Sequence, residues 1–124
     1  FSSTTPVPSA WGLADSVAFQ LLGEGLIHFH QRKKATFFDF YTINSHHPFR
    51  RPEDGVDSPE LKQQAATTPD SEMHGRYLTT LNYTDHHLGL FIKRMKDTGV
   101  AKDTVFFIFG DHGYNFEEKP GQGH

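Results

Sequence analysis

The sequence contains no cysteine, and this absence excludes several classes of protein. A disulfide scaffold, a cysteine-ligated zinc site, an iron–sulfur cluster and a thiol nucleophile all require that residue. No run of apolar residues approaches the roughly 18 that a membrane-spanning helix needs. Charges nearly balance, because 12 Lys and Arg against 15 Asp and Glu give a net charge of −3. The chain therefore lacks the broad cationic surface that binds nucleic acid, and no nucleic-acid partner is expected.

The chain is instead rich in histidine and phenylalanine. Its 124 residues lie within the range of one domain and include nine His and 12 Phe. The phenylalanines can build a sizeable core. So many histidines indicate metal binding or acid–base chemistry, and the alternative is that most of them are surface residues. The first residue is Phe1, no signal-peptide pattern follows it, and His124 ends a glycine-rich segment. We therefore expect residues 1–124 to be part of one domain of a longer protein.

The spacing of apolar residues predicts alternating helices and strands. Helical periodicity covers about 16–32 and 71–98, and short aromatic and β-branched runs cover 36–43 and 104–109. Asp15 is expected to cap the first helix, and Gly99 to follow the end of the second. Proline and glycine punctuate residues 50–72, which we interpret as an irregular surface excursion. The order helix, strand, helix, strand predicts an α/β fold with a mostly parallel sheet and right-handed crossovers.

Each predicted strand runs into a polar loop that contains histidine. Ser45-His46-His47 follows the first strand, and Gly110-Asp111-His112-Gly113 follows the second. In open α/β sheets, ligands bind at the carboxyl ends of the strands, so these loops form the candidate site. Asp111 and His112 offer an oxygen and a nitrogen donor, a pair that suits Zn²⁺ or Mn²⁺ better than Ca²⁺. The alternatives are a β-turn with an Asx hydrogen bond at Asp111 and a solvent-exposed loop at His46.

Other polar residues have plainer interpretations. Arg50 either meets an anionic group of a substrate or forms a solvated pair with Arg51. Asp85 falls on the expected inner stripe of the second helix, where we expect it to be partly buried and to tie the helix to a neighbouring loop. The remaining histidines within the predicted helices are interpreted as structural: His28, His30, His74, His86 and His87. The sequence shows no pattern of an activated nucleophile and no phosphate-binding loop.

Several of these segments together resemble the sulfatase and alkaline phosphatase superfamily. The apolar strand followed by Phe109-Gly110-Asp111-His112-Gly113 is similar to the metal-binding motif of that superfamily. Three further stretches resemble its lipoteichoic acid synthase branch: Trp11-Gly12-Leu13-x-Asp15, Thr42-x-Asn44-Ser45-His46-His47-Pro48-Phe49, and Tyr77-Leu78-x-x-Leu81-x-Tyr83-x-Asp85 through Leu88-Gly89-x-Phe91-Ile92. The resemblance covers most of residues 11–124 and is poorest over 50–72. It implies an alkaline phosphatase-like α/β fold, of which residues 1–124 form the C-terminal portion.

The resemblance also implies roles for individual residues. Asp111 and His112 match two metal ligands, and it implies one divalent ion, with Mn²⁺ or Zn²⁺ favoured over Mg²⁺ and Ca²⁺. His46 matches a histidine that contacts the substrate, and His124 resembles a further active-site histidine. The residues assigned to the substrate side are His46, His47 and Arg50. The nucleophile and an acidic metal ligand are expected upstream of Phe1, so the chain alone is expected to be catalytically incomplete.

These implications lead to one expected function and two alternatives. We expect a metal-dependent hydrolase or transferase of phosphoric or sulfuric esters, and the branch favours phosphoglycerol transfer. The alternatives are an arylsulfatase-type hydrolase of sulfate esters and an inactive fragment that binds a metal or an anion. The substrate is expected to be an anionic ester, either a lipid head group or a sulfated or phosphorylated glycan. Membrane association would come only from upstream segments, and the parent protein is expected to be membrane-anchored or extracytoplasmic.

Overall fold

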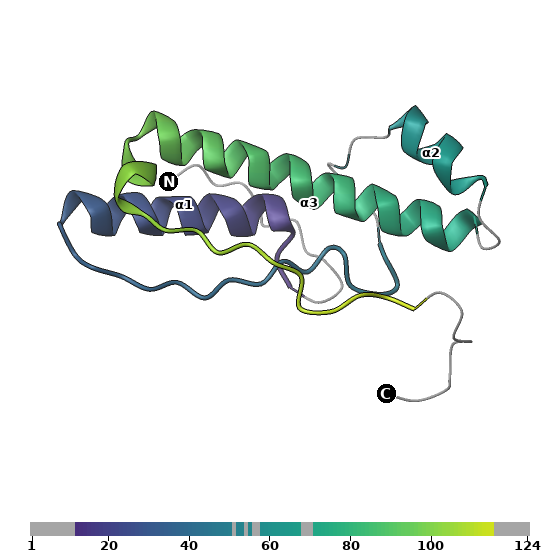
Figure 1. Cartoon of the computed structure of the whole chain (residues 1–124), viewed down its shortest axis with the longest axis horizontal. Coiled ribbons are helices and arrows are strands. Elements are labelled where there is room, and N and C mark those ends of the chain that lie inside the picture. The colour runs from purple at the N-terminus through teal and green to yellow at the C-terminus, as the bar shows by residue number, and fades with distance from the viewer. Residues whose placement is uncertain (1–11, 51, 54, 56–57, 68–70, 116–124) are drawn as a thin grey trace.

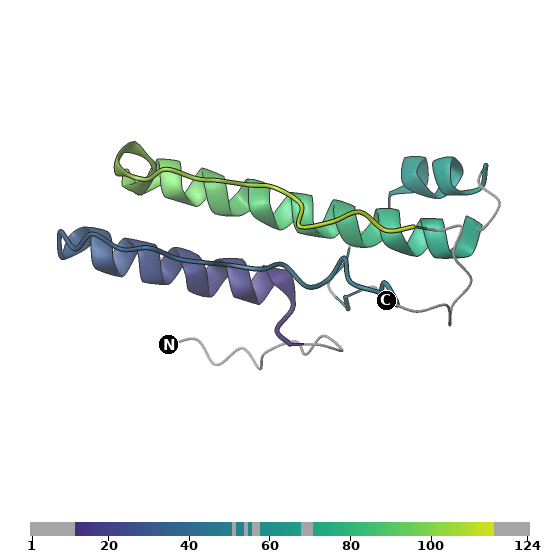
Figure 2. The same ribbon diagram turned by 60° about the horizontal axis from the view of Figure 1, so that its bottom comes forward.

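The computed structural model describes residues 12–50, 52–53, 55, 58–67 and 71–115. Its helices are α1 (Asp15–Gln31), α2 (Pro59–Ala65), α3 (Ser71–Asp97) and the short 3₁₀ helix η1 (Val100–Asp103). α1 and α3 run side by side in the same direction, and α2 packs against the first part of α3 (Figure 1 and Figure 2). None of the described helices is long and apolar enough to cross a membrane.

The core lies between α1 and α3. Phe19 of α1 packs on Phe91 of α3 with ring centroids 5.5 Å apart, and Met95 and Val100 are buried beside them. Gly23 allows this close approach, because a Cβ atom there would lie 3.3 Å from Cε of Met95. The large side chains of Phe91 and Met95 in α3 therefore pack against Gly23 of α1, which has no side chain.

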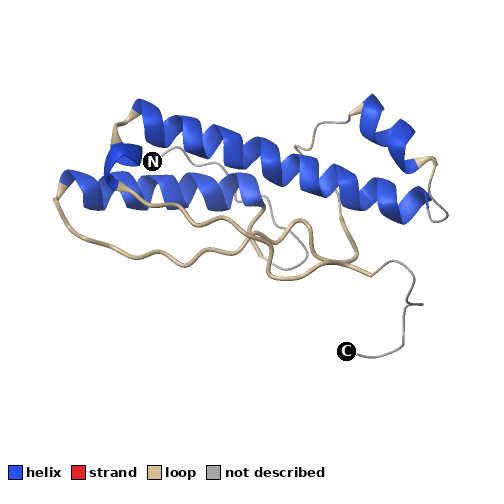
Figure 3. Cartoon of the chain, in the orientation of Figure 1, coloured by secondary structure: helices blue, strands red, loops and turns tan. Residues whose placement is uncertain are grey.

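The predicted strands are extended segments that return along the helices. Residues 36–43 follow α1 and residues 104–109 follow η1, and both segments run in the same direction (Figure 1). Each contributes a ring to the core, since the Phe40 centroid lies 4.9 Å from that of Phe19, and the Phe106 centroid 5.9 Å from that of Phe91. Figure 3 shows both segments as loops, and the described residues form no β-strand. The predicted order and direction are present, whereas the parallel sheet stays a prediction.

The lack of a ladder has a physical explanation. A β-ladder requires a second strand about 4.8 Å away, with its N–H and C=O groups facing the first. The two extended segments instead lie along different helices (Figure 2). Outward side chains of the second segment are largely exposed, with Val105 78%, Phe107 84% and Phe109 83% accessible. Each apolar run is therefore packed on a helix, and the described part of the chain offers neither of them a pairing strand.

The start of α1 differs from the sequence-based expectation. Ala14 is the N-cap residue, with no side-chain cap, while Asp15 is the first helical residue and is completely buried. The N–H of Asp15 donates instead to Oδ1 of Asn44, 29 residues away, at 2.7 Å. Asn44 thus satisfies one of the amide groups that a helix leaves open at its N-terminus. The prediction that Asp15 is the N-cap was wrong by one residue, because the capping group comes from a distant loop.

Replacing Asn44 with alanine should lower the free energy of unfolding by about 1–2 kcal/mol, the usual cost of losing a helix cap or leaving a buried N–H unsatisfied. Denaturant-induced unfolding followed by circular dichroism measures this change. Thr42→Ala is the matched control, because Thr42 is exposed in the same segment. Equal stabilities of the two variants would show that Asn44 does not cap α1.

A short helix lies within the region predicted to be irregular. α2 begins at Pro59, and the hydroxyl of Ser58 accepts the N–H of Leu61 at 3.4 Å. The same hydroxyl donates to Oε2 of Glu60 at 2.7 Å, and this hydrogen bond, followed by one from the backbone of Glu60, lowers the pKa of the Glu60 carboxyl. Proline is favoured at the first position of a helix, where its missing N–H is no loss. The interpretation of residues 50–72 was wrong at α2 because it counted Pro59 only as a helix breaker.

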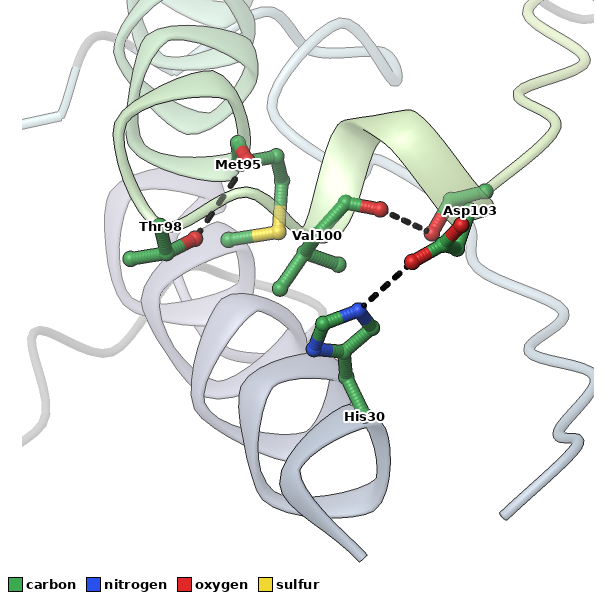
Figure 4. Close-up of polar contacts among 6 residues, drawn as sticks. His30, Met95, Thr98, Val100 and Asp103 are labelled. Atoms are coloured by element: carbon green, nitrogen blue, oxygen red, sulfur yellow. Dashed lines mark hydrogen bonds and ion pairs between the residues drawn. The ribbon is translucent and has the colours of Figure 1, made fainter. Parts of the chain in front are cut away.

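The ends of α1 and α3 are tied together at η1. Gly99 follows α3 with φ +79°, the left-handed conformation expected directly after a helix. Nε2 of His30, near the end of α1, lies 3.0 Å from Oδ2 of Asp103 (Figure 4). This contact joins the end of α1 to η1, and residues 104–109 start back along the helices from η1. His30 therefore makes a structural contact, as expected.

Candidate functional site

The first predicted site segment is a tight turn over residues 43–49, here called the His46 turn. The N–H of His46 donates to O of Ile43 at 3.1 Å, and the N–H of Phe49 donates to O of His46 at 3.0 Å. The His47–Pro48 peptide bond is cis. Phe49 is 1% exposed and packs edge-on against Tyr77 of α3, with ring centroids 5.1 Å apart. A buried ring therefore anchors the end of the turn, while the His46 and His47 side chains are exposed.

The backbone of the next residue orients the His46 ring. Nδ1 of His46 lies 2.7 Å from O of His47. A carbonyl oxygen can only accept a hydrogen bond, so Nδ1 carries the proton. In the neutral ring the lone pair is then on Nε2. This tautomer makes Nε2 the atom of His46 that can take up a proton or give one back.

The second segment places an oxygen and a nitrogen donor beside each other. Oδ1 of Asp111 accepts the N–H of the next residue, His112, at 2.9 Å, whereas the Asx hydrogen bond of the alternative interpretation would reach one residue further. Nδ1 of His112 lies 2.8 Å from O of Gly113, so Nε2 holds the lone pair of the neutral ring. Nε2 is 3.6 Å from Oδ2 of Asp111, and the side chains of Asp111 and His112 are 70% and 75% exposed. We call these two residues the donor pair.

The spacing of the donor pair fits the coordination of one metal ion. Two ligand atoms at about 2.1 Å from a tetrahedral zinc ion lie ~3.4 Å apart, close to the 3.6 Å observed. A histidine whose Nδ1–H is held by a carbonyl has the form typical of a metal ligand. Within the described ranges, no group of three or more His, Asp or Glu side chains could hold a metal. The described part of the chain therefore offers two donors, which is fewer than a metal site requires.

Tyr114 joins the two segments. Its ring stacks on His47, with centroids 6.1 Å apart and planes at 6°, and meets Phe49 edge-on at 4.9 Å. Its hydroxyl donates to Sδ of Met73 in α3 at 3.9 Å. Because Tyr114 is two residues beyond His112, these contacts bring the chain just after the donor pair against the His46 turn. The sequence pattern did not identify Tyr114, and its only signal is an aromatic residue directly after the glycine-flanked motif.

Asp15 is a second residue that the sequence pattern did not assign to the site. Its carboxylate is fully buried, and Oδ1 accepts the N–H groups of Ile43 at 2.8 Å and Asn44 at 3.3 Å. The hydroxyl of Thr84 in α3 donates to Oδ2 at 2.5 Å. Asp15 therefore connects both long helices to the start of the His46 turn.

Other predicted residues lie away from these contacts or outside the described ranges. Arg50 is exposed directly after the His46 turn, and His124 lies outside the described residues. Asp85 is exposed, so the prediction that it is partly buried and ties α3 to a loop was wrong. The prediction rested on an apolar stripe that includes Leu81, Ile92 and Met95. Met95 is buried and Ile92 packs on the core, but Leu81 is 37% exposed. The buried residues of α3 include Thr80, Tyr83 and Phe91 as well as Met95, so the buried face is rotated away from Asp85.

Comparison with known proteins agrees with the resemblance seen in the motifs. The lipoteichoic acid synthase-like protein YvgJ of Bacillus subtilis is 29% identical over 114 residues, which are 90% of this chain and 17% of that protein. Lipoteichoic acid synthase 1 of the same species is 29% identical over 101 residues, 82% of this chain and 14% of the relative. Lipoteichoic acid synthase of Staphylococcus saprophyticus is 31% identical over 101 residues, with the same coverage of both chains.

This chain spans 14–17% of the length of these relatives. No solved structure gives a significant match. The family model described as Sulfatase matches residues 4–124. Since that match covers nearly the whole sequence, the chain belongs to the Sulfatase family.

Proposed function

We propose that this chain carries metal-binding and substrate-side loops of a metal-dependent enzyme that transfers or hydrolyses phosphoric or sulfuric esters, with phosphoglycerol transfer as the favoured reaction. The observation that carries the proposal is the contact between the two loops. Tyr114, two residues beyond the donor pair, stacks on His47 of the His46 turn. Family membership and the lipoteichoic acid synthases among the relatives support the same class of reaction.

The donor pair would hold the divalent ion together with ligands from other parts of the protein. When bound, such an ion lowers the pKa of a coordinated hydroxyl group and neutralises charge on the transferring group. We favour Mn²⁺ or Zn²⁺ because Mg²⁺ and Ca²⁺ prefer oxygen ligands, and His112 offers nitrogen. The chain itself holds Oδ2 of Asp111 and Nε2 of His112 at 3.6 Å and fixes the tautomer of the histidine.

His46 would act on the substrate side. With Nδ1 held by O of His47, Nε2 is the atom that would share a proton with an ester oxygen. The exposed guanidinium of Arg50 would add a two-pronged contact to an anionic group, and His47 would line the same side. His124 is proposed as a further active-site histidine. These residues favour a substrate whose charge is concentrated on a phosphate or sulfate group, such as a lipid head group.

A comparison of substrates tests this function. The full-length protein, loaded with Mn²⁺, is assayed with a fluorogenic glycerol phosphodiester and with an aryl sulfate of the same fluorophore. We expect turnover of the phosphodiester and little turnover of the sulfate, with loss of activity on chelation and recovery when Mn²⁺ is returned. Preference for the sulfate would assign an arylsulfatase-type hydrolase instead. Metal binding without turnover of either ester would assign a binding module.

A further inference from the structure

The Asp15 carboxylate uses both of its oxygens, and two of its three donors belong to one segment. Oδ1 accepts the backbone N–H groups of Ile43 and Asn44, which lead directly into the His46 turn, and Oδ2 accepts the hydroxyl of Thr84. The side chain of Asn44 accepts in return from the N–H of Asp15 at 2.7 Å. The start of α1 and the backbone at residues 43 and 44 are therefore joined by hydrogen bonds in both directions.

A carboxylate is not needed to hold the two long helices together. Burying a charge is unfavourable unless strong hydrogen bonds compensate it. α1 and α3 are already joined by a neutral contact nearby, where the hydroxyl of Tyr83 donates to Oγ of Ser16 at 2.7 Å. Hydrogen bonds to an ionised group are roughly twice as strong as neutral ones. The buried charge of Asp15 therefore holds the backbone of the turn more firmly than a neutral side chain would.

We propose that Asp15 is a positioning residue for the reaction, and that it acts by fixing His46; this inference rests on the proposed function. The connection is short, because Ile43 donates its N–H to Asp15 and accepts the N–H of His46 on its own carbonyl oxygen at 3.1 Å. Any movement of the Ile43 backbone therefore carries His46 with it. A displacement of about 1 Å at a reacting group can cost ~10²-fold in rate. We expect a loss of that size when the hydrogen bonds from Ile43 and Asn44 to Asp15 are removed.

Graded replacements of Asp15 in the full-length, metal-loaded protein test the proposal. Asp15→Asn keeps the shape and an acceptor oxygen but removes the charge, whereas Asp15→Ala removes both contacts to the turn. We expect kcat to fall in that order, by ~10²-fold for alanine, with KM and bound metal little changed. Tyr83→Phe is the matched control, because it breaks the neutral contact with Ser16 and leaves residues 43 and 44 untouched. An unchanged kcat in Asp15→Asn, or an equal fall in Tyr83→Phe, would overturn the proposal.

A double-mutant cycle separates positioning from general stabilisation. If Asp15 acts through His46, adding Asp15→Asn to His46→Ala causes no further loss of kcat. Additive losses would overturn the positioning role and leave the proposed function intact. Full activity of His46→Ala would overturn the proposed function of His46, and this inference with it.

Hydrogen exchange gives a readout that does not depend on activity, and it serves even where Asp15→Ala does not fold. Exchange over residues 43–49 should become faster in Asp15→Asn, because the N–H groups of Ile43 and Asn44 lose a charged acceptor. Exchange within α3 should stay the same, and Tyr83→Phe should leave the turn as protected as in the original protein. Equal protection of residues 43–49 in Asp15→Asn and the original protein would show that Asp15 does not hold the His46 turn in place.

Discussion

Asp111→Ala in the full-length protein is expected to abolish binding of the divalent ion and, with it, turnover. The substitution removes Oδ2, which lies 3.6 Å from Nε2 of His112 and forms half of the donor pair. Loss of a group that merely supports a ligand typically costs about 10–100-fold in metal affinity, and loss of a ligand itself costs more. Metal content after gel filtration, measured by mass spectrometry alongside the rate of turnover, checks this expectation.

Asp103→Ala is the matched control for this experiment. Asp103 is also an exposed aspartate beside a histidine, since its Oδ2 lies 3.0 Å from Nε2 of His30, but it belongs to η1. We expect this variant to retain both metal and turnover. Because the Asp111 side chain is 70% exposed, Asp111→Ala should change the stability of the metal-free protein little. Full metal content in Asp111→Ala would show that the donor pair is not a metal site.

The long helices could be predicted because their apolar residues keep a helical period over many turns. α1 (Asp15–Gln31) and α3 (Ser71–Asp97) end within one residue of the predicted limits of 16–32 and 71–98. The rotation of α3 was harder to predict, since a shift of one residue turns the buried face by about 100°. That shift is why Asp85 is exposed. The seven residues of α2 are too few for a period, and only its start is marked, by the cap at Ser58 and by Pro59 at the first position.

The strands were predictable as extended conformations but not as a sheet. Side chains of an extended segment alternate between two faces. In the described residues, the helices cover one of these faces and leave the other exposed. Phe40 and Phe106 pack on the helices, whereas Phe37 is 91% exposed and Phe107 is 84% exposed. Residues that are apolar on both faces are typical of a strand buried within a parallel sheet. The local sequence specifies that environment, but it does not specify which segment supplies the neighbouring strand.

The candidate site could be predicted only where its residues are neighbours in the chain. Asp111 and His112 are adjacent, and His46 stands in a short motif, so local patterns are enough to name them as candidates. Asp15 reaches Ile43 across 28 residues and Thr84 across 69, and Tyr114 reaches Met73 across 41. No periodicity or spacing encodes such pairs. The residues that the patterns missed, Asp15 and Tyr114, are accordingly those whose contacts join distant parts of the chain.

His46→Ala is expected to leave the metal bound and to lower kcat by ~10²–10⁴-fold, the usual contribution of a general acid or base. The substitution removes the Nε2 atom that would share a proton with the substrate. The donor pair is untouched, and Tyr114 still stacks on His47 to hold the two loops together. Metal content and kcat, measured on the same preparation, test both parts of this expectation.

His28→Ala is the matched control for His46→Ala, because His28 is an exposed histidine of α1 whose Nδ1 lies 2.9 Å from Nη1 of Arg32. It should retain both metal and turnover. Loss of metal in His46→Ala would make His46 a ligand instead of a substrate contact, and full turnover would remove it from the reaction. Asp111→Ala should lose the metal and His46→Ala should keep it. That opposite pair of results would assign one loop to the metal and the other to the substrate, on the two sides of the contact that Tyr114 makes.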